Sequence, residues 1–339
     1  MPPRKTRSNA AGLALLLSGL LLAGFGCQSA APRLTPDESL ALERRATDLL
    51  LRAAQSEDPL VACHAIEALV HVAPEEGRPH FRAALRSPSP LLRAAGLKAL
   101  GTLADGSSAA MYRQLLSDNH PLVRLAAAFA VCRAGQTSAA RLLVTALDDN
   151  PEEHVRAEAA QLIGRLEEPR AIKRLQAALR LQANEQSNIV RLEIYTALAR
   201  LGDEEGTDRL IAAAQHDALS RLLALQGLAD VGTQRARDVL RYHLSDAEDY
   251  LIHRLIAARG LARLGEPIGY DLAIEKLRFV GSNPEDPEEA VRVRTNAAMV
   301  LGEIRDARAL PDLQNMAESE NDPRLQVAAC YAICRILQP

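Results

Sequence analysis

One phrase returns along almost the whole chain: a turn, then Val-Arg or a similar pair, then an Ala-rich run that ends in Leu-Gly. Taking the Arg of that phrase as an anchor gives nine copies, separated by 30 to 40 residues. The anchors are Ala62, Arg93, Arg124, Arg156, Arg191, Arg221, Arg254, Arg294 and Gln326. A period of this length is the signature of a repeat architecture, in which each unit packs on its neighbours.

The residues that follow each anchor predict a helix. Three positions on, the side chain is small in eight of nine copies, and seven positions on it is aliphatic in every copy. With the apolar residue ten positions on, these offsets trace one face of a helix. A second amphipathic segment lies in each period, behind turns such as Asp149-Asn150-Pro151, which cap and start helices. Each unit therefore reads as helix, turn, helix.

The composition agrees with this pattern. Hydrophobic residues make up 48% of the chain, but aromatic residues only 3%, and Trp is absent. Ala, Leu, Arg and Glu, which dominate, are strong helix formers. We therefore expect an all-α protein whose helices approach one another through small side chains.

In these repeats the chain resembles the HEAT family, and in particular the short HEAT-like repeats named after phycobilisome lyases. The resemblance covers about residues 37–337, and residues 293–311 show the family phrase most clearly. It implies an α-solenoid of about nine two-helix repeats, wound as a right-handed superhelix. If neighbouring helices stack 8–10 Å apart, the solenoid is roughly 70–90 Å long. Such a repeat specifies a shape rather than a reaction.

The first 26 residues do not fit the repeat. A positive segment with Arg4, Lys5 and Arg7 precedes an apolar run of about the length of a secretory signal. The run ends in Gly26-Cys27, which resembles a bacterial lipoprotein signal, in which the Cys is acylated and becomes the new N-terminus. The resemblance departs at Gly24, where the family favours an aliphatic residue, and an ordinary signal cut after Ala31 is the alternative.

This N-terminus predicts the organisation and location of the chain. We expect a signal peptide at 1–26, a lipidated Cys27 with a short tether at 27–36, and the solenoid at 37–339. The mature protein would be anchored to a membrane of the cell envelope, facing the periplasm or the exterior. Its formal charge of −3 would fall further on loss of three positive residues, which argues against nucleic-acid binding.

No catalytic motif stands out in the sequence. There is no Gly-rich phosphate loop and no Gly-x-Ser-x-Gly nucleophile motif. Deoxyhypusine hydroxylase, a HEAT-type enzyme, carries adjacent His-Glu pairs as iron ligands, and no His-Glu dipeptide occurs here. His64, Glu67 and His71 share a helix face, but seven residues span roughly 10 Å of helix, too far for both imidazoles to bind one ion. We expect no catalytic, cofactor-binding or metal-binding residues, and no enzyme.

Two Arg columns are the most repetitive polar features. Arg93, Arg124, Arg156, Arg191, Arg221, Arg254 and Arg294 form the anchor column, which we expect to be a structural ladder that pairs with Asp or Asn of the turns. Nine positions past the anchors stand Arg133, Arg165, Arg200, Arg263 and Arg335, beside apolar residues five positions past the anchors, Phe129, Met299 and Tyr331, which we expect to be exposed. Arg and aromatic residues are enriched in protein interfaces.

The function predicted from these columns is a non-catalytic scaffold in the bacterial cell envelope. It would bind a partner protein with an acidic surface along its concave groove, as a monomer or as a subunit of a hetero-complex. A HEAT-type or lyase-like enzyme with a dispersed site, and a structural subunit of an envelope complex, remain the alternatives.

The remaining cysteines fit the repeat as core residues. Cys132 and Cys334 stand where other copies hold Gly or Ala, and Cys330 stands at a position that is usually Ala. Cys behaves as a small buried apolar residue. We therefore expect buried thiols rather than disulfides.

Overall fold

The computed structural model describes residues 34–283, 285–286 and 288–338. It divides the chain into two units, Met1–Ala31 and Pro32–Pro339, and only the second is described below. The predicted signal peptide, Cys27 and nearly all of the tether lie outside the described residues. None of the described helices combines the length and the apolar character needed to cross a bilayer.

The described residues contain helices and no strand, which confirms the all-α solenoid. Nine helices form an outer layer: α1 (Pro36–Ala53), α3 (Pro74–Ala84), α5 (Ala109–Leu115), α7 (Ala140–Asp149), α9 (Ile172–Ala178), α12 (Glu204–Ala213), α14 (Gln234–Ser245), α16 (Tyr270–Lys276) and α18 (Leu310–Ser319). Nine form an inner layer: α2 (Pro59–Val72), α4 (Pro90–Thr102), α6 (Pro121–Arg133), α8 (Glu153–Arg165), α11 (Asn188–Arg200), α13 (Ala218–Val231), α15 (Leu251–Arg263), α17 (Glu288–Ile304) and α19 (Pro323–Leu337). A one-turn helix, α10 (Gln182–Glu185), precedes α11, and short 3-10 turns lead into four outer helices.

The helix starts follow the turn chemistry of the sequence. Thr35 and Glu38 form a capping box at the start of α1. Asp58 accepts a hydrogen bond from the backbone N–H of Leu60 at 2.8 Å, and Pro59 occupies the first position of α2. Such caps satisfy backbone donors that the helix itself leaves free.

The inner helices approach one another more closely than the outer helices do. A Cβ atom added to Gly164 would lie 2.8 Å from the Cα atom of Ala197 on the next inner helix, and one added to Gly302 would lie 2.8 Å from the Cα atom of Ala332. Because the small residues lie on the inner helices, each repeat is narrower on its inner side than on its outer side. A stack of such repeats curves towards the inner side.

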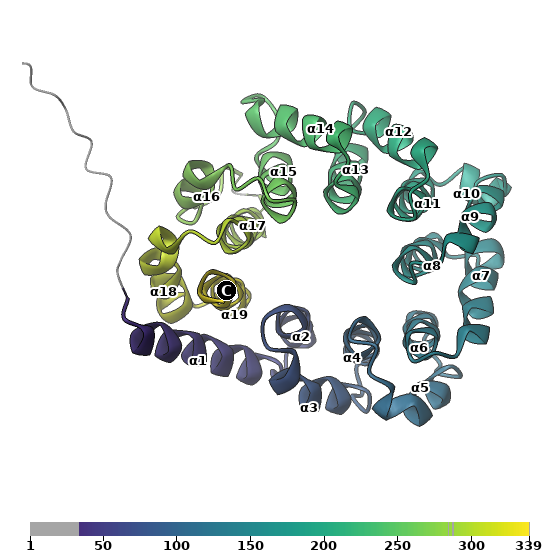
Figure 1. Cartoon of the computed structure of the whole chain (residues 1–339), viewed down its shortest axis with the longest axis horizontal. Coiled ribbons are helices and arrows are strands. Elements are labelled where there is room, and N and C mark those ends of the chain that lie inside the picture. Colours follow the sequence, from purple (N-terminus) through teal and green to yellow (C-terminus); the bar gives the residue numbers. More distant parts are fainter. Residues whose placement is uncertain (1–33, 284, 287, 339) are drawn as a thin grey trace, which may run out of the picture. The chain divides into compact units, whose positions relative to one another are not determined.

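This bending brings the two ends of the second unit together. Helix α19 packs against both α1 and α2, and buried residues of both ends belong to one hydrophobic cluster (Figure 1). Cys334 Sγ lies 3.7 Å from Thr47 Oγ1, and the Gln338 side-chain amide donates to the Val72 carbonyl at 2.5 Å. We call this contact of α19 with α1 and α2 the seam.

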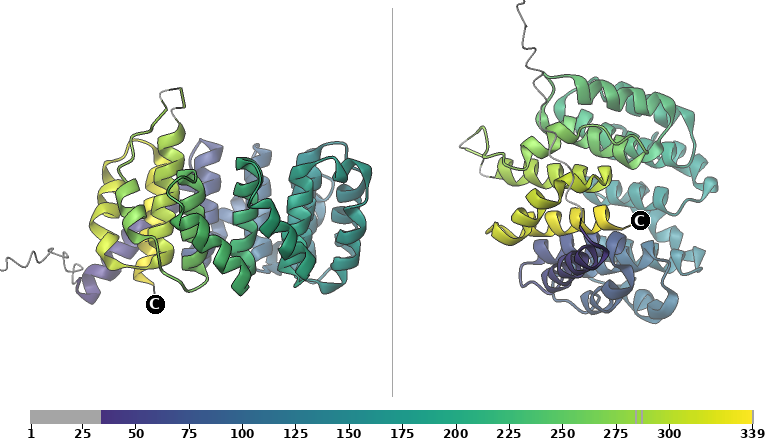
Figure 2. Two further views of the ribbon diagram at one scale, coloured as in Figure 1. Left: turned by 90° about the horizontal axis from the view of Figure 1, so that it is seen from above. Right: turned by 60° about the vertical axis from the view of Figure 1, so that its left-hand side comes forward.

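The second unit is therefore a closed ring rather than the open solenoid of roughly 70–90 Å that stacking in a line would give. The inner helices are seen end-on in Figure 1 and stand upright in the left view of Figure 2, so they run along the ring axis. The expected length was wrong because it took neighbouring repeats to be parallel.

The cysteine prediction is confirmed for the described residues. Cys63, Cys132, Cys330 and Cys334 are free and buried. Burial raises the pKa of Cys330 to about 12, so its thiol is protonated and unreactive at neutral pH.

Candidate functional site

The side chains two, five and nine positions past the anchors face the inside of the ring. Six inner helices, α2, α4, α8, α15, α17 and α19, enclose a cavity of about 610 Å³, called here the central cavity. Its polar lining consists of His64, Glu67, His71, Lys98, Thr102, Gln161, Arg165, Arg259, Thr295, Asn296, Arg324 and Tyr331. Because both ends of the chain contribute, the cavity exists only while the seam is closed.

The central cavity also has an apolar wall. Ile66 and Val70 of α2, Met299 of α17 and Val327 of α19 line it together with several alanines. Such a mixture of apolar surface and few charged groups is typical of sites for small organic molecules.

The predicted concave residues divide between the cavity and its surroundings. Arg165, Met299 and Tyr331 line the central cavity. The remaining four Arg side chains hold neighbouring repeats together. Arg200 and Arg263 both pair with Asp230, Arg335 pairs with Glu303, and Arg133 donates to the Gly101 carbonyl. Their role in binding a partner stays a prediction.

Two of the three apolar residues expected to be exposed are buried. Phe129 is 1% exposed, because the Arg165 guanidinium lies over its ring at 5.2 Å from the ring centre. Tyr331 is 3% exposed, and its hydroxyl donates to Glu303 Oε1 at 2.7 Å. The expectation of exposure was wrong for both, since the helix period does not show that a neighbour's side chain covers them.

The anchor column contacts the turns of the repeats. Contacts to the following repeat join Arg93 to Asp118 (2.9 Å), Arg156 to Asn184 (2.8 Å), Arg221 to Asp249 (2.8 Å) and Arg294 to Glu320. Among the described residues, the anchors between them, Arg124, Arg191 and Arg254, have no hydrogen bond to the following repeat. Arg124 and Arg254 instead donate to carbonyls of preceding residues.

Charged groups on one side of the seam shift the pKa of a histidine on the other side. Desolvation lowers the pKa of His71, the Glu303 carboxylate raises it, and Arg263, Arg259 and Arg335 lower it. His71 belongs to α2, whereas the groups that act on it belong to α15, α17 and α19. Its side chain is exposed and lines the central cavity. A lowered pKa keeps the imidazole neutral at pH 7, so that it can accept a proton.

Beside the cavity lies a mixed cluster of charges. Burial raises the pKa of Glu193 to about 7, together with the carboxylates of Glu158 and Asp230 and against the effect of Arg200. Glu158 itself pairs with Lys98 of the cavity lining at 3.3 Å, across the intervening helix α6. The interior is thus an electrostatically coupled surface rather than a row of separate charges.

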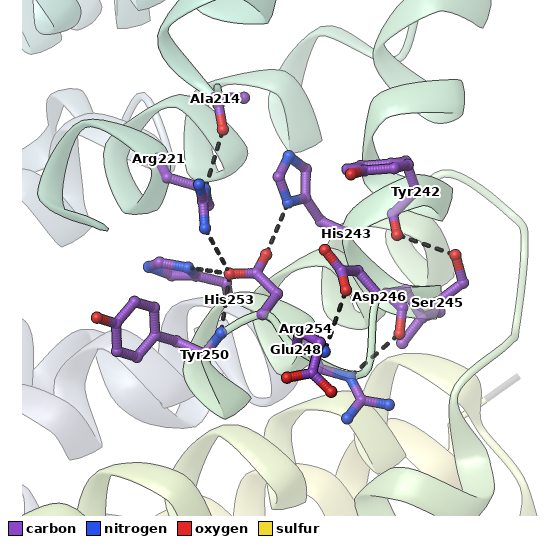
Figure 3. A network of polar contacts seen from close by, with 12 residues as sticks. Ala214, Arg221, Tyr242, His243, Ser245, Asp246, Glu248, Tyr250, His253 and Arg254 are labelled. Carbon is purple, nitrogen blue, oxygen red and sulfur yellow. Dashed lines mark hydrogen bonds and ion pairs between the residues drawn. The ribbon is translucent and has the colours of Figure 1, made fainter. Parts of the chain in front are cut away.

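A second polar cluster lies at the corner of α14 and α15 and was not predicted. Figure 3 shows Arg221, His243 and His253 pointing at one unlabelled carboxylate. The ion pairs of these three side chains identify it as that of Asp249. Their donor atoms lie 2.7–2.9 Å from its oxygens, and the carboxylate is fully buried. These donors lower the pKa of Asp249 to about 2, against its burial. Because its donors come from three helices, we assign this cluster to the stability of the ring.

The described residues hold no group of three His, Cys, Asp or Glu side chains placed to bind a metal ion. His64, Glu67 and His71 do all line the central cavity.

The fold and the cavity define this protein as an α-solenoid of HEAT-type repeats closed into a ring. Sequence comparison agrees. The model of HEAT repeats matches residues 46–113 and 109–187, and the model of the PBS lyase HEAT-like repeat matches residues 293–319. These matches support the HEAT-repeat family. A comparison with curated proteins found no match.

Solved structures with a similar fold include two enzymes. Human deoxyhypusine hydroxylase in complex with glycerol is 18% identical, with a TM-score of 0.37, covering 89% of this chain and 99% of its own. The complex of CpcE and CpcF of phycocyanin lyase from Nostoc sp. PCC7120 is 20% identical, with a TM-score of 0.42, covering 81% of this chain and 98% of its own. Both are enzymes, which corrects the expectation that the chain is not an enzyme; that expectation rested on the absence of a known catalytic motif. Likeness at this level assigns no activity.

Proposed function

We propose that this protein binds a small organic molecule in its central cavity and acts on it by acid–base chemistry, as a lyase-like HEAT-repeat enzyme. The observation that carries this proposal is the cavity of about 610 Å³, partly open to solvent, with ionisable side chains in its wall. Sites for small molecules have volumes of about 300–1,000 Å³.

The chemistry rests on α2. His71 is a candidate general base, because its lowered pKa leaves a nitrogen free to accept a proton. His64 and Glu67 lie on the same helix face and also line the cavity. Removal of a proton by a base is a step of an elimination.

Closure of the ring makes an extended protein partner a weaker proposal. An acidic envelope protein bound along the Arg133, Arg165, Arg200, Arg263 and Arg335 column would have to insert a segment into the ring. Three of these five guanidiniums are already paired with Asp230 or Glu303.

Binding can be tested with N-phenyl-1-naphthylamine, an uncharged probe whose fluorescence rises in apolar sites. We expect saturable binding of one probe per chain. Val70→Trp should abolish it by filling the cavity, whereas Val280→Trp, at a residue that is 92% exposed, should not. Equal binding by the Val70 variant, with helix content unchanged, would place the probe elsewhere and contradict the proposal.

The chemistry can be tested by incubating the protein with a mixture of small metabolites and following their masses. We expect at least one compound to be converted by the unmodified protein and not by His71→Gln. Conversion at the same rate by both would remove His71 from the mechanism.

We also propose that the chain is exported and anchored through Cys27. The support is the sequence of residues 1–27, with its positive segment, apolar run and Gly-Cys end. Cys27→Ser should abolish labelling by a fatty-acid analogue and release the protein from membranes. An unmodified chain that never takes up the label would contradict the anchor.

A further inference from the structure

Two of the four cations that line the central cavity have no carboxylate partner among the described residues. Lys98 pairs with Glu158 at 3.3 Å, and Arg324 pairs with Glu288 at 2.6 Å. Arg165 donates only to the Thr102 hydroxyl, at 2.7 Å, and lies over the ring of Phe129. Arg259 has its Nε atom buried without any hydrogen-bond partner.

An unpaired guanidinium in such a place is unusual. Charged groups withdrawn from water are normally paired or fully hydrogen-bonded, because their desolvation is costly. In the described part of the chain, Glu67 is the one carboxylate of the cavity lining, against four cations. Arg324 also pairs with Asp322 at 2.7 Å. Arg165 and Arg259 therefore remain beside one carboxylate of the lining, Glu67.

Charges of both signs act on the neighbouring groups. Arg259, Arg263 and Arg335 each act to lower the pKa of His71, against the effect of Glu303. Burial and Arg200 lower the pKa of Arg165, against the effects of Glu158, Asp230 and Glu67. An anion beside Arg259 would add to the groups that raise the pKa of His71.

The two unpaired side chains come from opposite sides of the ring. Arg165 ends α8, and Arg259 lies on α15, two inner helices that face each other across the interior (Figure 1). Between them, Met299, Val70 and Val327 provide apolar surface in the same cavity. A ligand that satisfies both features has a charged group and an apolar body.

We infer that the molecule bound in the central cavity is an organic anion, with a carboxylate, sulfonate or phosphate group held by Arg259 and an apolar body against Met299 and Val70. This inference rests on the proposed function, and it adds the class of the ligand. Guanidinium groups bind such oxyanions through short, charge-assisted hydrogen bonds.

The test compares two probes with the same aromatic skeleton. 8-Anilinonaphthalene-1-sulfonate carries a sulfonate, and N-phenyl-1-naphthylamine lacks it. We expect the sulfonate to bind about tenfold more tightly to the full chain, as one additional charge-assisted contact gives. Arg259→Met should remove most of this preference and leave the affinity for the uncharged probe unchanged.

Two variants serve as controls. Lys173→Met removes a positive charge from the exposed surface of α9 and should leave both affinities unchanged. Arg259→Lys keeps the charge and should retain part of the preference, which separates loss of the anion site from loss of the fold if Arg259→Met does not fold.

The outcomes separate the two proposals. Equal affinity for both probes, or a preference that survives in a folded Arg259→Met protein, would overturn the anion site and leave the cavity as a binding site. Binding of neither probe would overturn the proposed function and the inference with it. A sulfonate preference that is lost on removal of the Arg259 guanidinium supports both.

Discussion

At the scale of the residue, the ring interior changes the properties of groups that would be ordinary at an open surface. Glu193 lies on the inner side of α11, where burial and the carboxylates of Glu158 and Asp230 raise its pKa to about 7. A pKa above that of the unfolded chain means that the folded state binds this proton more tightly. The stability gained from Glu193 is therefore complete below about pH 4, near the pKa of an unperturbed Glu, and is lost as the pH rises through 7.

The raised pKa of Glu193 predicts how a substitution there changes stability with pH. Glu193→Gln keeps the shape of the neutral side chain and removes its ionisation, so it should raise the melting temperature at pH 8 and change it little at pH 5. Glu185→Gln, at an exposed position of α10, should have the same effect at both values. Thermal unfolding at the two pH values measures the difference. A destabilised Glu193 variant at pH 8 would show that its carboxylate is needed in the ionised form.

The sequence could predict which side chains face inward but not which ones meet. The helix period alone places Arg133, Arg165 and Arg200 on the inner face. Whether Arg165 covers Phe129, and whether Arg259 lies near enough to lower the pKa of His71, depends on the rotation between successive repeats. No spacing along the chain carries that information.

At the scale of the element, α19 is the last helix of the chain but not an end of the packing. Ile333 is 1% exposed, as buried as Leu198 in the middle of the ring, which is 2% exposed. In an open stack, a terminal repeat has one neighbour and contributes less to stability. In the ring, α19 has α17 on one side and α1 and α2 on the other.

We therefore expect Ile333→Asp to be as damaging as Leu198→Asp, because both bury an unpaired carboxylate in apolar surroundings. Leu219→Asp, at a residue that is 51% exposed, should be nearly neutral. Denaturant unfolding followed by circular dichroism gives the three free energies of unfolding. A mild effect at Ile333 beside a severe one at Leu198 would indicate an open end.

The pairs of helices themselves could be read from the sequence. The nine anchors, the small column and the Asp-Pro turns predict nine units, and nine inner helices are found in the described residues. The short helix α10 was missed, because its four residues are too few to show a period.

At the scale of the whole described unit, closure of the ring follows from the close approach of neighbouring inner helices. Small residues such as Gly164 and Gly302 allow this approach. The sequence shows these small residues but not the angle that each step adds. A slight change in that angle, multiplied over nine repeats, separates a ring from an open superhelix.

The seam offers the most direct test of closure, on which the central cavity depends. Thr47 on α1 and Cys334 on α19 are 287 positions apart in sequence, and their side chains are 3.7 Å apart. Thr47→Cys should form a disulfide with Cys334 under mild oxidation, detected by peptide mapping, with helix content unchanged. The same variant carrying Cys334→Ala should show no such link. The oxidation is run at pH 9, because burial raises the pKa of the Cys334 thiol to about 11. If the two thiols of a folded Thr47→Cys protein stay free under these conditions, the ends do not meet, and the cavity and the function assigned to it lose their basis.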